Sequence, residues 1–207
     1  MFIAGTGTDI GKTQVVGMLA RRAQASGLRV ITQKWVQTGV RPGDKTDLDA
    51  HDAWFGAQAP DLMPWRLPYR FEPAVSVHLA AQLAQTPIDW EVIKSAYFEL
   101  KKRFDLVIVE GAGGAFSPVS AQLSSPLMTE LAQSLGLPIW VVVPNEVGGI
   151  HAGVATLAAL NARGVCVAGV ILNQRLPDVD PLVLADNAAY FQQNYPGLSV
   201  DCFPFRG

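Results

Sequence analysis

The residues best suited to chemistry stand near the start of the chain, where positions 5–13 read Gly-Thr-Gly-Thr-Asp-Ile-Gly-Lys-Thr. An apolar run at 2–4 precedes this segment, and a run suited to a helix, 14–25, follows it. Backbone N–H groups of a glycine-rich loop between a strand and a helix point at an anion, and the helix start adds partial positive charge. Lys12 would bring a full charge to the β- and γ-phosphates, and Thr13 a hydroxyl to Mg²⁺. The segment therefore predicts a site for a nucleoside triphosphate.

The glycine spacing departs by one position from the common P-loop pattern. That pattern places its first glycine five residues before the glycine of Gly-Lys. Thr6 stands there in this chain, and Gly5 comes one residue earlier. A turn without a ligand is the alternative, but Gly-Lys-Thr at the mouth of a helix directly after a strand favours a phosphate loop.

Polar residues also end two later apolar runs. Glu110 ends the run that begins at Asp105, which is the Walker B arrangement that delivers a carboxylate to Mg²⁺. The small residues at 111–114 let the backbone approach a ligand closely. Lys34 ends another run, and because lysine is rarely buried without a partner, we interpret it as a second clamp on phosphate. The alternatives are a solvated strand end for Glu110 and a surface lysine for Lys34.

Other polar residues give weaker signals. Asp47 and Asp49 lie at an expected helix start, and the sequence leaves open whether they cap the helix or whether one binds the metal. We expect His51 on a helix surface, His78 after an irregular loop and His151 near a helix start, each with a structural role.

Apolar runs that alternate with amphipathic stretches indicate how these residues are positioned. The expected strands are 2–4, 28–32, 104–109, 139–143, 165–172 and 198–203. The expected helices are 12–26, 46–57, 75–85, 89–102, 126–135, 149–162 and 181–194. This order predicts one α/β domain over residues 1–207, of the P-loop NTPase type, with a mostly parallel sheet and helices on both faces. Ligands bind such sheets beyond the carboxyl ends of the strands.

Glycine, serine and proline residues mark the expected ends of several helices. Helices should stop at three glycines, Gly27, Gly136 and Gly164. Ser125-Pro126 is typical of an N-cap followed by proline at the first helical position. The proline-rich stretch 58–73 is expected to be an irregular surface loop.

Composition narrows the function classes. The 207 residues are 49% hydrophobic and 16% charged, which suits a parallel sheet buried on both faces. The net charge of −2, without a basic patch, argues against a nucleic-acid partner. No apolar run reaches the ~18 residues of a membrane span, and a first strand at residue 2 leaves no room for a leader, so we expect a cytoplasmic protein. Of the cysteines Cys166 and Cys202, we expect Cys166 to be a buried thiol.

Together these segments resemble the dethiobiotin synthetase family of the biotin pathway. The resembling segments are 5–13, 34–39, 46–47, 71–81, 109–118, 148–151 and 172–173. They fall in the family's order, and their combination is more specific than any one of them.

The resemblance implies an ATP- and Mg²⁺-dependent cyclo-ligase acting on CO₂ (or bicarbonate) and 7,8-diaminopelargonate, through a carbamate and a carbamic–phosphoric anhydride. It implies Lys12 and Lys34 as catalytic clamps on phosphate and Thr13, Asp47 and Glu110 as Mg²⁺ ligands. It implies nucleotide contacts at Asp9, Ile10, Gly11, Lys12, Thr13, Gln14, Glu110, Gly111, Ala112, Gly113 and Asn173, with Asn173 reading the adenine. It implies substrate contacts at Thr38, Gly148, Gly149, Ile150 and His151.

In the family two chains pair, so the resemblance implies a homodimer in which the substrate carboxylate meets the partner's segment 148–151. Four features depart from the family pattern: Gly7 replaces an Asp, Trp35 and Val77 replace prolines, and the chain ends at Gly207, earlier than the family. Because the family's longer C-terminal segment helps to enclose the base, we expect weak discrimination among nucleotides.

Two other functions remain as alternatives. One is another amide-forming P-loop ligase, similar to cobyrinate synthases, although these normally carry a further glutamine-hydrolysing domain. The other is a partitioning or regulatory ATPase, which usually has an extra lysine early in the phosphate loop, where this chain has Gly7.

Overall fold

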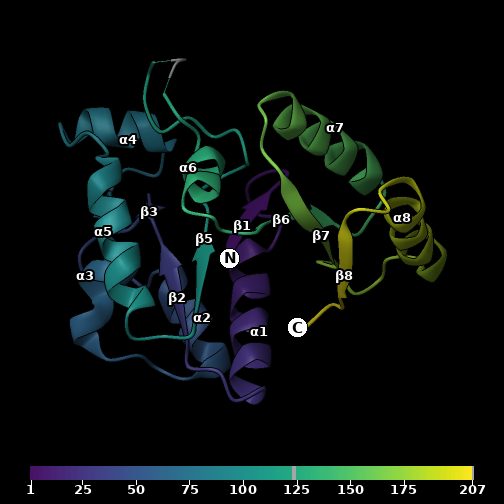
Figure 1. Ribbon diagram of the computed structural model, residues 1–207, viewed down its shortest axis with the longest axis horizontal. Helices are drawn as coiled ribbons and strands as arrows, with labels where there is room; N and C mark the ends of the chain where they lie inside the picture. Colours follow the sequence, from purple (N-terminus) through teal and green to yellow (C-terminus); the bar gives the residue numbers. More distant parts are fainter. Residues whose placement is uncertain (123–124, 207) are drawn as a thin grey trace.

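The computed structural model describes residues 1–122 and 125–206. Its centre is a six-stranded sheet in the order β2-β5-β1-β6-β7-β8, in which every neighbouring pair is parallel (Figure 1). The strands are β1 (Phe2–Gly5), β2 (Val30–Lys34), β5 (Leu106–Glu110), β6 (Ile139–Pro144), β7 (Val167–Asn173) and β8 (Ser199–Phe203). All six correspond to predicted strands, with slightly shifted ends.

The seven predicted helices are also present. They are α1 (Lys12–Ala25), α2 (Asp47–Phe55), α4 (Val77–Leu83), α5 (Trp90–Lys101), α6 (Met128–Ser134), α7 (Gly149–Ala162) and α8 (Pro181–Asn194). Gly27, Gly136 and Gly164 have positive φ and follow α1, α6 and α7, as predicted. None of the helices among the described residues combines the length and apolar character needed to cross a bilayer.

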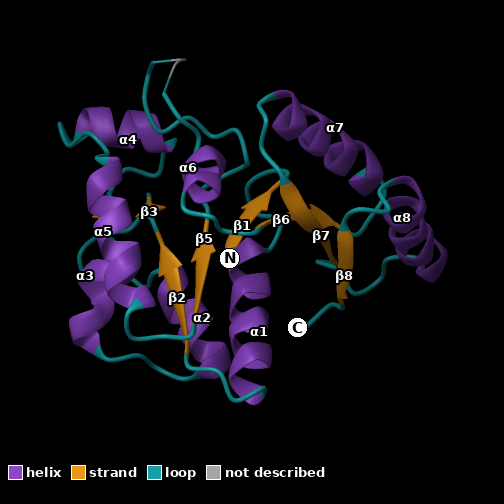
Figure 2. Cartoon of the chain, viewed as in Figure 1, coloured by secondary structure: helices purple, strands orange, loops and turns teal. Residues whose placement is uncertain are grey.

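Side-chain alternation along the strands divides the core into two layers. In β1, Phe2 and Ala4 belong to one buried cluster and Ile3 to the other, and β5, β6 and β7 alternate in the same way. Helices α5, α6, α7 and α8 contribute to the first cluster, while α1 and α2 contribute to the second. The sheet therefore carries helices on both faces, which confirms the predicted fold class (Figure 2).

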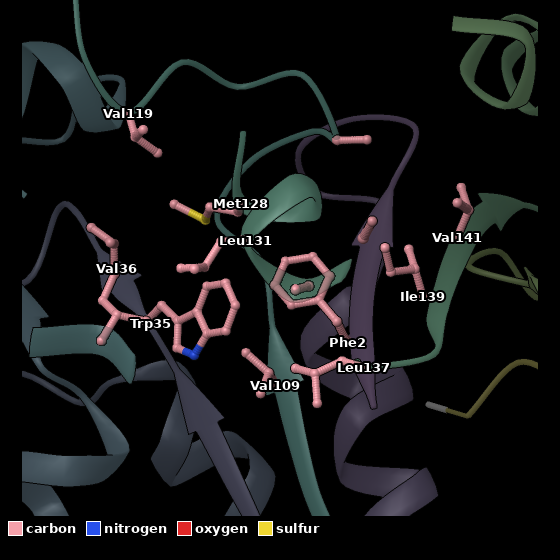
Figure 3. Packing of buried hydrophobic residues seen from close by; sticks show 14 of the residues in the cluster. Phe2, Trp35, Val36, Val109, Val119, Met128, Leu131, Leu137, Ile139 and Val141 are labelled. Atoms are coloured by element: carbon pink, nitrogen blue, oxygen red, sulfur yellow. The ribbon is translucent and has the colours of Figure 1, made fainter. Parts of the chain in front are cut away.

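Trp35 anchors the first cluster near the functional residues. Its indole is fully buried, lies 5.0 Å from the ring of Phe2 and lies below Met128 and Leu131 of α6 (Figure 3). The indole N–H donates to the side chain of Gln33 at 2.9 Å, which satisfies its one polar atom. Within β2, Ile31 belongs to the first cluster and Val30 to the second. Because successive residues of a strand point to opposite faces, Lys34 lies on the same face as Val30, that of α1 and α2.

The stretch 58–73 is not the irregular loop that was predicted. It contains a 3₁₀ turn η1 (Pro60–Leu62), the short helix α3 (Met63–Arg66) and β4 (Tyr69–Arg70), which pairs in parallel with β3 (Val36–Gln37). Two of the prolines, Pro60 and Pro64, lie in the first turns of η1 and α3, where a residue needs no N–H for the helix.

Two smaller predictions are also wrong. Helix α6 starts at Met128, where Glu130 accepts a hydrogen bond from the N–H of Leu127, so Ser125 and Pro126 precede the helix instead of capping it. Cys166 is exposed, because it lies in the connection between α7 and β7 and not in the strand. Its backbone N–H donates to the side chain of Gln133.

Candidate nucleotide and metal site

The glycine-rich loop joins β1 to α1 at the carboxyl edge of the sheet. Gly11 has a φ of 85°, and a Cβ atom there would lie 2.2 Å from Nδ2 of Asn173, so only glycine fits. Asp9 adopts a φ of 56°, which is uncommon for a residue with a side chain, and its carbonyl accepts a 2.9 Å hydrogen bond from Arg175. Lys12 is 6% exposed, and its Nζ donates to the carbonyl of Gly7 at 2.7 Å.

Two neighbouring strands deliver Lys34 and Glu110 to the same place. The register of β2 and β5 puts these residues opposite each other. Nζ of Lys34 lies 2.7 Å from Oε1 of Glu110 and 2.7 Å from Oδ2 of Asp47. The hydroxyl of Thr13, on the first turn of α1, donates to the same Oε1 at 3.1 Å. Four of the predicted functional residues thus form one connected cluster: Thr13, Lys34, Asp47 and Glu110.

The start of α2 gives its two aspartates different surroundings. Asp49 accepts hydrogen bonds from the N–H and the hydroxyl of Thr46, at 2.6 and 2.8 Å, so it caps the helix. The N–H of Asp47 donates to the side chain of Gln37, and its carboxylate faces Lys34. Of the two acids, Asp47 is the one directed at the cluster.

Electrostatics keep these groups charged. Burial alone would raise the pKa of Glu110, but the Lys34 charge and the hydrogen bond from His51 outweigh burial and lower the pKa to about 2. Burial would lower the pKa of Lys34, but Glu110 and Asp47 raise it above its ordinary value. Burial lowers the pKa of Lys12 to about 8, with Glu110 acting in the opposite direction.

His51 differs from the prediction of a surface residue. Its side chain is fully buried, and Nε2 lies 2.7 Å from Oε2 of Glu110. It sits four residues after Asp47 on α2, so both side chains lie on the face that meets β2 and β5. The spacing of Leu48 and Phe55, three residues before and four residues after His51, marks the same buried face and is the signal that could have placed His51 there.

The remaining residues expected at the nucleotide surround the loop. Asn173 ends β7, is 1% exposed and donates from Nδ2 to the carbonyl of Ile10 at 3.0 Å. Gly113 lies near Thr8, where a Cβ would be 3.9 Å from the threonine hydroxyl. Gln14 donates to the carbonyl of Arg206 at 3.1 Å. Gly111 and Ala112 directly follow Glu110 at the end of β5.

The expected substrate residues make no hydrogen bond to this cluster among the described residues. Thr38 is half-buried and follows Gln37 at the end of β3. Gly148 caps α7 with a φ of 90°, and a Cβ at Gly149 would lie 2.2 Å from the carbonyl oxygen of Pro144. Ile150 is half-buried and His151 is exposed in the first turn of α7. Within the described residues, no hydrogen bond joins segment 148–151 to Lys12, Lys34 or Glu110.

The chemistry of the donors fits Mg²⁺. Thr13, Asp47 and Glu110 offer oxygen atoms, which this cation prefers. Asp47 and Glu110 both contact Lys34, and Thr13 contacts Glu110. Over residues 1–122 and 125–206, no three His, Cys, Asp or Glu side chains are arranged to hold a metal. A Mg²⁺ ion bound here would therefore complete its shell with phosphate oxygens and water, as is usual in phosphoryl-transfer sites.

A parallel sheet with a glycine-rich loop between β1 and α1, and Lys-Thr as the first two residues of α1, defines a P-loop protein. Two solved structures have a similar fold. A ParA family ATPase from Chlorobium tepidum TLS matches with a TM-score of 0.58 and 11% identity, over 99% of this chain and 84% of that chain. A chain of the MinC:MinD cell division protein complex from Aquifex aeolicus matches with a TM-score of 0.59 and 14% identity, over 99% of this chain and 80% of that chain. At these identities the likeness shows the fold alone.

Sequence relatives define the family more closely. Residues 1–197 match a family described as an AAA domain. The chain is 34% identical over 178 residues to the ATP-dependent dethiobiotin synthetase BioD of Brachyspira hyodysenteriae, over 84% of this chain and 78% of that protein. It is 35% identical over 184 residues to the protein of the same name from Anaeromyxobacter sp. (strain Fw109-5), over 88% and 80%. The chain belongs to the dethiobiotin synthetase family.

Proposed function

We propose that this protein is an ATP- and Mg²⁺-dependent cyclo-ligase that converts 7,8-diaminopelargonate and CO₂ to dethiobiotin. The observation that carries this proposal is the convergence of Lys34, Asp47 and Glu110 beside the phosphate loop, at 2.7 Å for each ion pair. The names of the sequence relatives support the substrate.

The reaction brings two anions together. One amine of the diamine adds to CO₂ and loses a proton, which gives a carbamate. A carbamate oxygen then bonds to the γ-phosphorus as the bond to ADP breaks, which gives a carbamic–phosphoric anhydride. The second amine attacks the carbonyl carbon and loses a proton, the ring closes to a cyclic urea, and inorganic phosphate leaves. Each turnover thus consumes one ATP and releases one ADP and one phosphate.

The chain's own residues supply the charge that this reaction needs. Lys12 and Lys34 bind the phosphates and stabilise the charge that develops during phosphoryl transfer. Thr13, Asp47 and Glu110 would hold Mg²⁺, which when bound neutralises charge on the β- and γ-phosphates. The backbone of residues 9–14 and 111–113 surrounds the phosphates, and Asn173 contacts the base.

A second copy of the chain completes the proposed site. The first turn of α7 carries the partial positive charge of a helix start, which suits the substrate carboxylate, and segment 148–151 would present it to the partner's site. Exposed apolar side chains flank this turn: Val147 is 85% exposed and Leu182 of α8 is 74% exposed. They line a hollow of about 400 Å³ with Gly148 and Ile150. This apolar patch supports a homodimer.

The test supplies ATP, Mg²⁺, bicarbonate and 7,8-diaminopelargonate. We expect a cyclic urea by mass spectrometry and one phosphate released per product. Equal phosphate release with and without the diamine would contradict the proposal and favour a regulatory ATPase. Phosphate release that requires a different carboxylate and an amine donor would instead favour another amide-forming ligase.

A further inference from the structure

The two oxygens of the Glu110 carboxylate have separate partners. Oε1 accepts from Lys34 at 2.7 Å and from Thr13 at 3.1 Å. Oε2 lies 2.7 Å from Nε2 of His51, and no other hydrogen bond to Oε2 occurs among the described residues. Because an ionised carboxylate only accepts, Nε2 of His51 carries the hydrogen of this bond.

His51 is suited to hold this carboxylate in one orientation. Its ring is fully buried, and Nδ1 is buried without a hydrogen-bond partner, so Glu110 is the ring's single polar contact among the described residues. The terminal torsion of a glutamate has a broad, two-fold energy profile. Without a donor to Oε2, the carboxylate plane of Glu110 would be free to rotate away from Thr13.

We propose that His51 is a positioning residue that fixes the carboxylate of Glu110, so that Oε1 is presented to Thr13 and Lys34 and the metal affinity of the nucleotide site is raised. This inference rests on the proposed function, because that function assigns Thr13 and Glu110 to Mg²⁺. Partners that orient a ligating side chain change metal affinity by roughly 10–100-fold in other sites. The same scale is expected here.

Three substitutions separate this role from simple filling of space. His51→Leu keeps an apolar volume but removes the donor. His51→Gln keeps an amide N–H near the place of Nε2. His51→Asn also keeps an amide, but its shorter side chain cannot reach Oε2. The Gln and Asn variants form a matched polar pair, and their comparison still tests the role if the leucine variant fails to fold.

The measurement is binding of Mn²⁺ by electron paramagnetic resonance, in the presence of a non-hydrolysable ATP analogue and without the diamine. We expect Mn²⁺ affinity to fall by about 10–100-fold in His51→Leu and His51→Asn and by less than about threefold in His51→Gln. Affinity for the analogue in EDTA should be equal in all variants.

Each other result has a definite meaning. Wild-type Mn²⁺ affinity in His51→Asn or His51→Leu would overturn the positioning role while leaving the proposed function intact. Equal weakening in His51→Gln and His51→Asn would show that ring shape, and not the hydrogen bond, matters, and would also overturn it. A wild-type protein whose nucleotide complex binds no Mn²⁺ would overturn both the metal assignment in the proposed function and this inference.

Discussion

The ammonium of Lys34 and the carboxylate of Glu110 form an ion pair of 2.7 Å in which both side chains are almost completely buried. Such a pair is costly to desolvate, and removal of one partner leaves an uncompensated charge. Buried charges at the carboxyl ends of parallel strands are typical of a ligand-binding site, because ligands bind beyond these strand ends. The pair therefore ties folding stability to the proposed chemistry.

Glu110→Gln should reduce both turnover and stability. Glutamine removes the charge that Mg²⁺ needs, so we expect turnover to fall by more than about 100-fold. Stability should fall by less than the ~3–5 kcal/mol of a fully broken buried pair, because Asp47 still faces Lys34.

Urea denaturation of Glu110→Gln, Lys34→Met and the double variant tests the coupling. The loss of unfolding free energy in the double variant should be smaller than the sum of the losses in the two single variants. Strict additivity of the free-energy changes would show that the pair does not interact.

Lys34→Gln should separate chemistry from nucleotide binding. A lysine that acts on the transition state contributes more to kcat than to ground-state affinity. We expect kcat to fall by ~10²-fold or more, on the scale of one lost charge-stabilising donor. The affinity for a fluorescent ATP analogue should change much less. Equal losses in kcat and affinity would show that Lys34 binds the nucleotide in the ground state. Unchanged kinetics would show that Lys34 takes no part in the reaction.

The two aspartates at the start of α2 offer a matched comparison. Asp47→Asn removes a carboxylate that faces Lys34 and should lower turnover and raise the Mg²⁺ concentration needed for activity. Asp49→Asn weakens a capping box and should cost about 1 kcal/mol of stability, with turnover retained. Kinetics and thermal unfolding of both variants distinguish them. A larger loss of turnover in Asp49→Asn than in Asp47→Asn would reverse the assignment.

The success of the sequence predictions follows the range of the interactions involved. Glycine-rich loops, apolar strands and glycine stops depend on neighbours in sequence, so the phosphate loop and the strand end at Glu110 could be predicted. The contact of His51 with Glu110 depends on how α2 packs against β5, which no local pattern encodes. The roles of Asp47 and Asp49 likewise depend on which of them faces Lys34 once the helix is placed.

The pair Arg29–Asp105 predicts a pH response at the opposite edge of the sheet. Arg29 contacts both oxygens of Asp105, and these hydrogen bonds lower the pKa of Asp105 to about 2. Because the folded pKa lies below the ordinary 3.8, the pair stabilises the fold above that pH and the contribution is lost as pH falls towards 2. In Arg29→Gln, carboxyl NMR titration should show the pKa of Asp105 raised part of the way towards 3.8, because the backbone N–H of residue 29 still donates to this carboxylate. Arg21→Gln, at an exposed position of α1, is the control, and an unshifted Asp105 in Arg29→Gln would contradict the prediction.

Leu182→Glu should dissociate the proposed dimer. This exposed leucine and Val147 flank the start of α7, and a buried carboxylate in an apolar interface is strongly unfavourable. We expect a monomer at micromolar concentration by analytical ultracentrifugation, unchanged circular dichroism, and a marked rise in KM for the diamine, because the partner's helix start would no longer meet the substrate carboxylate. Leu83→Glu is the control, since Leu83 is 60% exposed at the end of α4 and lies outside the patch. A Leu182→Glu protein with the mass and the KM of the wild type would show that this patch is not the interface that completes the site.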